Sequence, residues 1–248
     1  MKIGIIGVGN IGGTLARKLT SAGHEVRVAN SKGVDDVKPF ADEAGATAVD
    51  VRGAVSGADL VIMSIPLPAL GKLPKDLFKY VPGSVPVVDT SNYYPRMRDP
   101  QIADLDAGEV ESVWVSKQLG RPIIKAFNNI LAESLSELGR PEGAAGRLAV
   151  AVAGDDAAAK QVVMGIVNEI GFDPVDAGSL AESWRQQPST PAYCCDYPAA
   201  TMRKALGAAV KGEAPKKRDQ LPEKMGALGP NPTHSDVVAM NRSLNPLT

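Results

Sequence analysis

The feature that most constrains this chain is a glycine-rich motif between a short apolar strand and an amphipathic helix. The predicted strand covers residues 3–6, and residues 7–12 read Gly-Val-Gly-Asn-Ile-Gly. Residues 10–22 then carry apolar side chains at helical spacing, and residues 25–29 predict a second strand. A Gly-x-Gly-x-x-Gly motif in a strand–helix–strand unit indicates a binding site for the pyrophosphate of a dinucleotide.

Each glycine of the motif has a physical role in such a site. Gly7 permits a tight turn, Gly9 lets the backbone approach the phosphates, and Gly12 lets the helix pack closely on the strand. The first amide groups of the helix carry the positive end of its dipole and point toward the ligand. We therefore predict that the pyrophosphate is bound by Gly7, Val8, Gly9, Asn10, Ile11 and Gly12. The alternative is a glycine-rich turn without a ligand.

Strand and helix signals alternate over roughly the first 175 residues. Continuous apolar strands are predicted at residues 60–64, 85–88, 122–126 and 148–153, of the kind that is buried on both faces of a parallel sheet. The clearest helix between such strands covers residues 155–170. This alternation predicts an α/β fold with a doubly wound, Rossmann-type, mostly parallel sheet.

The composition changes near residue 180, after which prolines recur and helical periodicity becomes weak. One short helix is predicted at residues 202–210, and little regular structure is expected after residue 226. We expect residues 1–180 to form a dinucleotide-binding domain. Residues 181–248 are expected to form a proline-rich, irregular extension that packs on this domain or on the second subunit of a homodimer.

Charge and composition exclude several classes of function. The 27 Lys and Arg residues and 28 Asp and Glu residues give a net charge of −1, which removes the electrostatic case for binding nucleic acid or a membrane surface. No apolar run reaches the roughly 20 residues that span a bilayer, and the N-terminus has no signal-peptide pattern. Cys194, Cys195, His24 and His234 cannot supply a zinc site of normal spacing. We expect a cytoplasmic protein without a metal, in which the adjacent Cys194 and Cys195 are two buried or idle thiols. The alternative is a strained disulfide between them.

The end of the second predicted strand indicates which dinucleotide is bound. Sites that prefer NAD place a carboxylate here for the ribose hydroxyls, whereas this chain has Asn30, Ser31 and Lys32. No carboxylate follows before Asp35. An amide, a hydroxyl and a cation suit a 2′-phosphate, so we predict that the cofactor is NADP. The alternative is an ordinary solvated turn.

Three polar loops follow other predicted strands, at the sheet edge where open α/β folds bind ligands. We predict that Ser64, Ile65, Pro66 and Asn92 border the nicotinamide ribose, and that Asn128 orients the carboxamide or the hydride acceptor. The apolar wall of a second, substrate pocket is predicted at Tyr93, Tyr94, Trp184 and Tyr193. Each loop could equally be an ordinary turn.

Catalytic acid–base patterns are absent from the sequence. Lys125 and Asn129 have the spacing of the Lys/Asn pair in hydroxyacid dehydrogenases, but Lys125 ends a predicted strand rather than lying on a helix. Lys125 and Asn128 are the candidate catalytic residues. Without an acid–base set, the chain suits hydride transfer between two redox cofactors, in which positioning matters most.

Several segments together resemble the coenzyme F420-dependent family of NADP oxidoreductases. They are residues 5–12, 28–32, 64–66 and 125–128. The resemblance implies a Rossmann-type fold, a pyrophosphate at the glycine loop, and a nicotinamide that faces a deazaflavin or another hydride acceptor. It also implies that the 2′-phosphate lies at Ser31 and Lys32. Lys32 stands where the family usually has Arg. Lys retains the charge but loses bidentate phosphate recognition.

These observations predict an NADPH-dependent oxidoreductase that transfers hydride between the nicotinamide and a small redox partner such as coenzyme F420 or a flavin. One alternative is an NADP-binding redox sensor without turnover, in which the extension responds to the nucleotide. A second is a hydroxyacid-type dehydrogenase that uses Lys125, although the residues after 180 are too few for the large helical domain of such enzymes.

Overall fold

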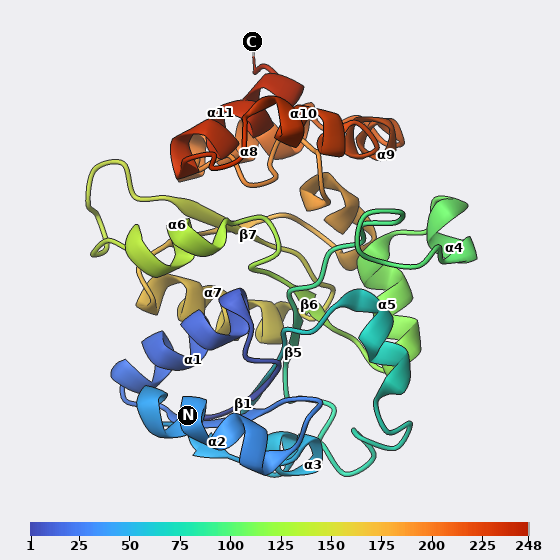
Figure 1. Cartoon of the computed structure of the whole chain (residues 1–248). Helices are drawn as coiled ribbons and strands as arrows, with labels where there is room; N and C mark the ends of the chain where they lie inside the picture. Colours follow the sequence, from blue (N-terminus) through green and yellow to red (C-terminus); the bar gives the residue numbers. More distant parts are fainter. Residues whose placement is uncertain (248) are drawn as a thin grey trace.

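A parallel six-stranded sheet lies at the centre of the computed structural model, which describes residues 1–247 (Figure 1). Its strands are β1 (Lys2–Ile6), β2 (Glu25–Ala29), β3 (Thr47–Ala48), β4 (Leu60–Met63), β5 (Val87–Asp89) and β6 (Ile124–Lys125). They follow the order β3-β2-β1-β4-β5-β6, so all strands run in the same direction, but successive strands are added outward on one side of β1 up to β3 and on its other side from β4 onward. The predicted doubly wound parallel sheet is confirmed. Ligands of such sheets bind at the carboxyl side of this switch point.

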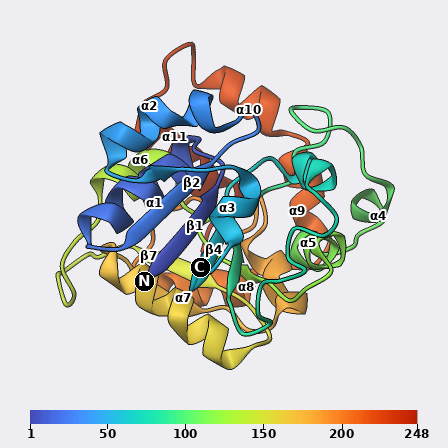
Figure 2. The same ribbon diagram turned by 90° about the horizontal axis from the view of Figure 1, so that it is seen from below.

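Helices cover both faces of the sheet, since the central strands are apolar on both sides. The connecting helices are α1 (Asn10–Ser21), α2 (Val34–Ala44), α3 (Val51–Val55), the 3₁₀ helix η1 (Leu67–Lys72), α4 (Ala103–Asp106), α5 (Glu111–Leu119), α6 (Ala132–Glu137) and α7 (Ala157–Glu169). Figure 2 shows α1 and α2 on one side of β2, β1 and β4, and α3 on the other. In β4, Leu60 and Ile62 pack with the α1 side, while Val61 and Met63 pack with the α3 side.

A second, two-stranded sheet continues the first one beyond β6. It consists of β7 (Ala149–Val152) and the parallel strand β8 (Asp173–Asp176). Lys125 and Ala153 join the two sheets by reciprocal backbone hydrogen bonds of 2.8 and 3.0 Å in antiparallel orientation. The polar loop after β6 therefore lies next to the end of β7.

The residues after β8 form five further helices, most of which lie at one end of the molecule (Figure 1). These are η2 (Leu180–Gln186), α8 (Ala199–Ala208), α9 (Glu213–Arg218), α10 (Leu221–Ala227) and α11 (His234–Leu244). Met202 and Leu206 of α8 pack on Ala151 and Val175 of the small sheet. The short helix expected near residues 202–210 is therefore present, a few residues earlier than expected.

The structure differs from the sequence expectation after residue 226, where α11 is a regular helix. Its start is a capping box: Asp236 N donates to Thr233 Oγ1 at 3.2 Å, and Thr233 N donates to Asp236 Oδ2 at 2.9 Å. Met240 and Leu244 are buried against Leu221 of α10. Local capping and this small apolar cluster order a segment whose periodicity alone is weak.

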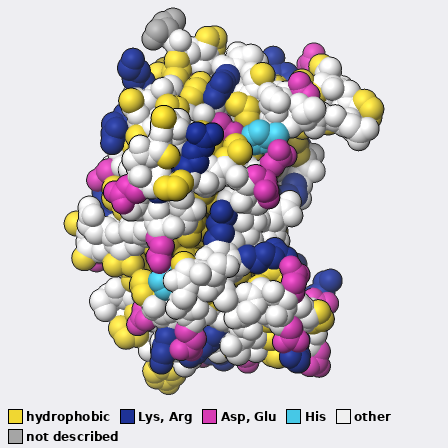
Figure 3. Space-filling view, turned by 90° about the vertical axis from the view of Figure 1, so that its left-hand side faces the viewer, with side chains coloured by type: hydrophobic (Ala, Val, Ile, Leu, Met, Phe, Trp, Pro, Cys, Tyr) yellow, Lys and Arg dark blue, Asp and Glu magenta, His cyan; other side chains and the backbone are white. Residues whose placement is uncertain are grey.

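The surface carries both signs of charge close together. On the face drawn in Figure 3, Lys and Arg side chains are interspersed with Asp and Glu, and a hollow separates the upper part of the molecule from the lower part. Within residues 1–247, no helix combines the length and apolar character needed to cross a bilayer.

Candidate functional site

The glycine loop between β1 and α1 is tightly constrained at its two ends. Gly7 has φ +100°, and a Cβ added there would lie 2.1 Å from the carbonyl oxygen of Ser64. A Cβ added at Gly12 would lie 2.0 Å from the carbonyl oxygen of Gly7. Neither position can accept a side chain without moving the backbone, so the sequence forces the loop into this tight shape.

The middle of the loop is open. A Cβ at Gly9 would meet no described atom within 4 Å, and Gly9 is an exposed residue with φ −72° and ψ −165°. Gly9 is also the N-cap of α1, and no described side chain caps this helix. The first amide groups of α1 are consequently free to bind an anion, which is the geometry that a pyrophosphate requires.

A groove of about 440 Å³ gives access to this loop. Val8, Gly9 and Asn10 form one side of it, and Glu133 and Ser136 of α6 form the opposite side. Three of the six predicted pyrophosphate-binding residues, Val8, Gly9 and Asn10, thus border an accessible groove. The volume falls in the range of roughly 300–1,000 Å³ that ligand sites occupy.

Asn30, Ser31 and Lys32 form the turn between β2 and α2. The side-chain oxygen of Asn30 accepts hydrogen bonds from the backbone amides of Lys32 at 2.9 Å and of Gly33 at 3.1 Å. Ser31 and Lys32 are exposed, with 74% of the Lys32 side chain accessible. The turn is held by Asn30 and presents its hydroxyl and ammonium groups to solvent.

Asp36 belongs to the same cluster and was missed by the sequence analysis. It accepts a 2.7 Å hydrogen bond from Asn30 Nδ2, and its other oxygen lies 3.7 Å from Lys32 Nζ. The first turn of α2 carries this carboxylate back over the loop. An acidic residue in the first turn of a helix is common because it favours the helix dipole, so its type and position alone did not single it out.

Ser64 and Ile65 contact the glycine loop directly. The Ser64 hydroxyl accepts a 3.2 Å hydrogen bond from Thr90 Oγ1, and a Cβ at Gly7 would lie 2.8 Å from Cγ2 of Ile65. Pro66 is exposed and precedes η1. The loops after β1, β4 and β5 therefore meet at the switch point of the sheet.

Asn92 and Asn128 join the loops after β5 and β6. Asn92 Nδ2 donates to the carbonyl oxygen of Asn128 at 2.9 Å, and Asn128 Nδ2 donates to Asn92 Oδ1 at 3.1 Å. Asn128 also donates to the backbone oxygen of Gln186 and accepts from Gln186 Nε2, both at 2.8 Å. Asn128 is buried, and its amide already holds three segments of the chain together.

Lys125 is completely buried at the end of β6. Its ammonium group forms an ion pair of 2.7 Å with Asp89, which is equally buried, and also donates to the carbonyl oxygen of Ser91. Asp89 in turn accepts a 3.0 Å hydrogen bond from the amide of Ser91. This arrangement fixes the loop after β5 and gives Lys125 a structural role.

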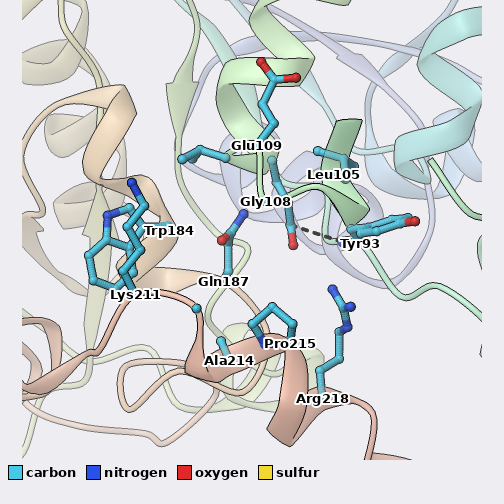
Figure 4. Close-up of a pocket in the computed structure, with 13 residues that line it drawn as sticks. Tyr93, Leu105, Gly108, Glu109, Trp184, Gln187, Lys211, Ala214, Pro215 and Arg218 are labelled. Atoms are coloured by element: carbon cyan, nitrogen blue, oxygen red, sulfur yellow. Dashed lines mark hydrogen bonds between the residues drawn. The ribbon is translucent and has the colours of Figure 1, made fainter. Parts of the chain in front are cut away.

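The four aromatic residues of the predicted second pocket separate into two pairs. Tyr93 and Trp184 line a cavity of about 80 Å³ between α5, η2 and α9 (Figure 4). Tyr94 and Tyr193 lie instead beside Asn92, where their hydroxyl groups hydrogen bond to each other and Asn92 Nδ2 donates to Tyr193 at 3.2 Å. Burial raises the pKa of both Tyr94 and Tyr193. The cavity beside Tyr93 is too small for a flavin or deazaflavin ring system.

Glu111, the first residue of α5, also lines the cavity, and the sequence analysis did not identify it. Its carboxylate accepts a 3.2 Å hydrogen bond from the amide of Tyr93. Burial raises the pKa of Glu111 to about 7, although the positive charges of Lys125 and Arg218 oppose this rise. A glutamate at the start of a helix is usually exposed, so only the packing of the extension reveals that this one is buried.

The described residues contain neither a cluster of metal-binding side chains nor a disulfide. Among residues 1–247, no group of three or more His, Cys, Asp or Glu residues could hold a metal ion. Cys194 and Cys195 are free and buried. Burial raises the pKa of the Cys194 thiol, and raises the pKa of Cys195 to about 12. The prediction of two buried thiols rather than a disulfide is confirmed.

Comparisons with known proteins agree with the geometry of the glycine loop. The family model described as "NADP oxidoreductase coenzyme F420-dependent" matches residues 2–93. YjhV of Escherichia coli (strain K12) is 59% identical over 105 residues, which are 42% of this chain and 77% of YjhV.

Two crystal structures share the fold. The hypothetical protein SMa0349 from Sinorhizobium meliloti is 31% identical, with a TM-score of 0.62, over 75% of this chain and 89% of that protein. A protein from Arthrobacter sp. FB24, named for a suggested F420-dependent NADP-reductase activity, is 24% identical, with a TM-score of 0.58, over 74% of this chain and 87% of that protein. The sheet topology, the open glycine loop and the matched residues agree, and the chain therefore belongs to the coenzyme F420-dependent family of NADP oxidoreductases, as a Rossmann-type oxidoreductase that uses a nicotinamide dinucleotide.

Proposed function

We propose that this protein is an NADPH-dependent oxidoreductase that transfers hydride between the nicotinamide and a small redox partner such as coenzyme F420 or a flavin. The observation that carries the proposal is the glycine loop. Gly7 and Gly12 are sterically locked, while Gly9 and the start of α1 remain open. Such a loop binds a pyrophosphate by backbone amides, and the bound cofactor supplies the hydride chemistry.

The 2′-phosphate of NADP is proposed to lie at Asn30, Ser31 and Lys32. Lys32 supplies the positive charge and Ser31 a hydroxyl donor, while Asn30 holds the turn in place. Asp36 opposes this preference, since its carboxylate neighbours both Asn30 and Lys32. A bound phosphate must therefore draw the Lys32 ammonium away from Asp36.

The nicotinamide end is proposed to lie at the switch point of the sheet. Ser64, Ile65, Pro66 and Asn92 would border its ribose, and Tyr94 and Tyr193 would form the side of the acceptor pocket next to Asn92. The role proposed for Asn128 is to orient the loops through Asn92 rather than to take part in proton transfer. Positioning of this kind is the main contribution that a protein makes to hydride transfer.

Stopped-flow mixing of the purified protein with NADPH and coenzyme F420, flavins or quinones tests the reaction. We expect rapid oxidation of NADPH with one of these acceptors. Binding without turnover for every acceptor would reject the oxidoreductase and favour the NADP-binding sensor.

A cytoplasmic location and a homodimer, with residues 181–248 as an extension of the domain formed by residues 1–180, remain predictions. Light scattering on the full chain tests the dimer.

Calorimetric titration tests the choice of cofactor independently of the acceptor. A charge-assisted hydrogen bond contributes about 1.5–3 kcal/mol, so Lys32→Ala should weaken NADP binding by roughly 10- to 150-fold. NAD lacks the 2′-phosphate and should bind equally well to both proteins. Equal losses for NAD and NADP would contradict the assignment of Lys32.

A further inference from the structure

The cavity beside Tyr93 has a lining that the proposed redox function does not use. Its walls come from Tyr93, the turn before α5, η2 and the segment that contains α9. In Figure 4, Arg218 extends from α9 toward Tyr93, and Trp184 lies beside Lys211. A dashed line ends at Tyr93, whose backbone amide donates a hydrogen bond to Glu111. The cavity thus combines apolar walls with two cations and one buried acid.

Arg218 is the best-defined cation of this cavity. Only 12% of its side chain is accessible, and its guanidinium group lies 5.3 Å from the centre of the Tyr93 ring. Among residues 1–247, its Nε atom is buried without a hydrogen-bond partner, and its ion pair with the exposed Asp219 is long, at 3.6 Å. A buried hydrogen-bond donor without a partner is unfavourable. This guanidinium group is therefore a candidate to bind a ligand that carries a hydrogen-bond acceptor into the cavity.

Glu111 lines the same cavity, yet it forms no ion pair with Arg218 among the described residues. Lys125 and Asp89 face Glu111 from the ends of the strands, and Arg218 faces it from α9. Glu109, at the rim, is paired with Lys117. The cavity is therefore placed between a buried acid and an unsatisfied guanidinium group.

We propose that this cavity binds a small monocarboxylate, with its carboxylate group at Arg218 and Lys211 and its carbon chain against Trp184, Leu105 and Pro215. A water molecule needs about 10–15 Å³ of such space, so 80 Å³ accommodates about five to eight atoms of this size. With its two oxygens counted, that number fits a carboxylate of about three to six carbons.

The charges favour a monoanion over phosphate or a dicarboxylate. Two cations face the cavity, but the carboxylate groups of Glu111 and Glu109 reduce the net positive field. A bound anion favours the protonated form of Glu111, which can then donate a hydrogen bond to it. Binding should therefore take up a proton, and affinity should fall as the pH rises through the pKa of Glu111, which is about 7.

Calorimetric titration of the full chain with sodium propionate tests the site. Arg218→Met should weaken propionate binding about tenfold or more, whereas Lys216→Met removes a cation from the exposed side of the same helix and should have no effect. Lys211→Met serves as a second variant at a position whose side chain is exposed and should weaken binding about threefold. Wild-type affinity in both Arg218→Met and Lys211→Met would overturn the proposal.

Two further titrations define the ligand class. In the wild type, propionate affinity should fall about tenfold between pH 6.5 and 8.5, and Glu111→Gln should remove this dependence. Inorganic phosphate that binds as tightly as propionate would reject a monocarboxylate site. NADP titrations of the same variants separate this inference from the proposed function, because Arg218 and Lys211 lie outside the glycine loop and NADP affinity should not change.

Discussion

The carboxyl edge of the sheet, where the ligand is proposed to bind, has two halves that are built in different ways: the glycine loop after β1, and the loops after β5 and β6. At the glycine loop, shape comes from the backbone: Gly7 and Gly12 cannot accept a Cβ, and Gly9 remains open. At the ends of β5 and β6, shape comes from buried charged and polar side chains, chiefly the Lys125–Asp89 pair and Glu111. The first half is therefore sensitive to any Cβ added at its glycines, whereas the second half is sensitive to the loss of its buried charged and polar side chains.

The largest expected effect is at the buried ion pair. Lys125→Met leaves Asp89 as an unpaired charge in the interior and should lower the free energy of unfolding by about 3–5 kcal/mol. Lys125→Met combined with Asp89→Asn should recover part of this loss, since the uncompensated charge is removed. Urea unfolding of the two variants and the wild type measures both effects. A loss below about 1 kcal/mol in Lys125→Met would show that the ion pair does not organise this half of the edge.

The second effect is a pH dependence that originates at Glu111. Because burial raises its pKa in the folded state to about 7, the protonated form is favoured by folding. This contribution to stability is complete below the unfolded pKa of about 4.3 and is lost as the pH rises through about 7. Relative to the wild type, Glu111→Gln should therefore gain about 1–3 kcal/mol in unfolding free energy between pH 5 and pH 8. If the difference in unfolding free energy between Glu111→Gln and the wild type does not vary with pH, Glu111 is not the source of this pH dependence.

The smallest expected effect concerns Asp36, whose carboxylate lies next to Lys32 and weakens the proposed binding of the 2′-phosphate. Asp36→Asn retains the acceptor for Asn30 but removes the negative charge next to Lys32. Exposed charge pairs contribute about 0.2–1 kcal/mol, so NADP affinity should rise at most about fivefold. Asp35→Asn, on the same turn of α2, is the matched control. An equal rise in NAD affinity would show that Asp36 does not act on the binding of the 2′-phosphate.

The same contrast explains what the sequence could predict. Glycine spacing and apolar strands encode the backbone directly, and they predicted the parallel sheet and the tight loop at Gly7 and Gly12. Glu111 and Asp36 could not be recognised in this way, because acidic residues in the first turn of a helix are usually solvated. The regular helix after residue 226 had a readable signal, since Thr233 and Asp236 have the spacing of a capping box.

The separation of the four predicted pocket aromatics also lay beyond the sequence. Tyr93 and Tyr94 are adjacent, but the loop after β5 sends the first toward α4 and the second toward Tyr193. Tyr93 is held there because its hydroxyl donates to Asp106 at 2.9 Å and accepts from the amide of Ile102 at 2.8 Å. Long-range hydrogen bonds, rather than residue type, decide which aromatic side chain reaches which pocket.

The most direct test of the central claim, that the open glycine loop binds NADP, is a calorimetric titration of Gly9→Ala with NADP. The backbone of Gly9 is extended, and its Cβ position meets no described atom within 4 Å, so the variant should fold with unchanged thermal stability. Gly83→Ala, also in open space, is the matched control. We predict that NADP binding is lost or greatly weakened in Gly9→Ala and retained in Gly83→Ala, because the added methyl group occupies the path of the pyrophosphate. Wild-type NADP affinity in a correctly folded Gly9→Ala protein would contradict the account.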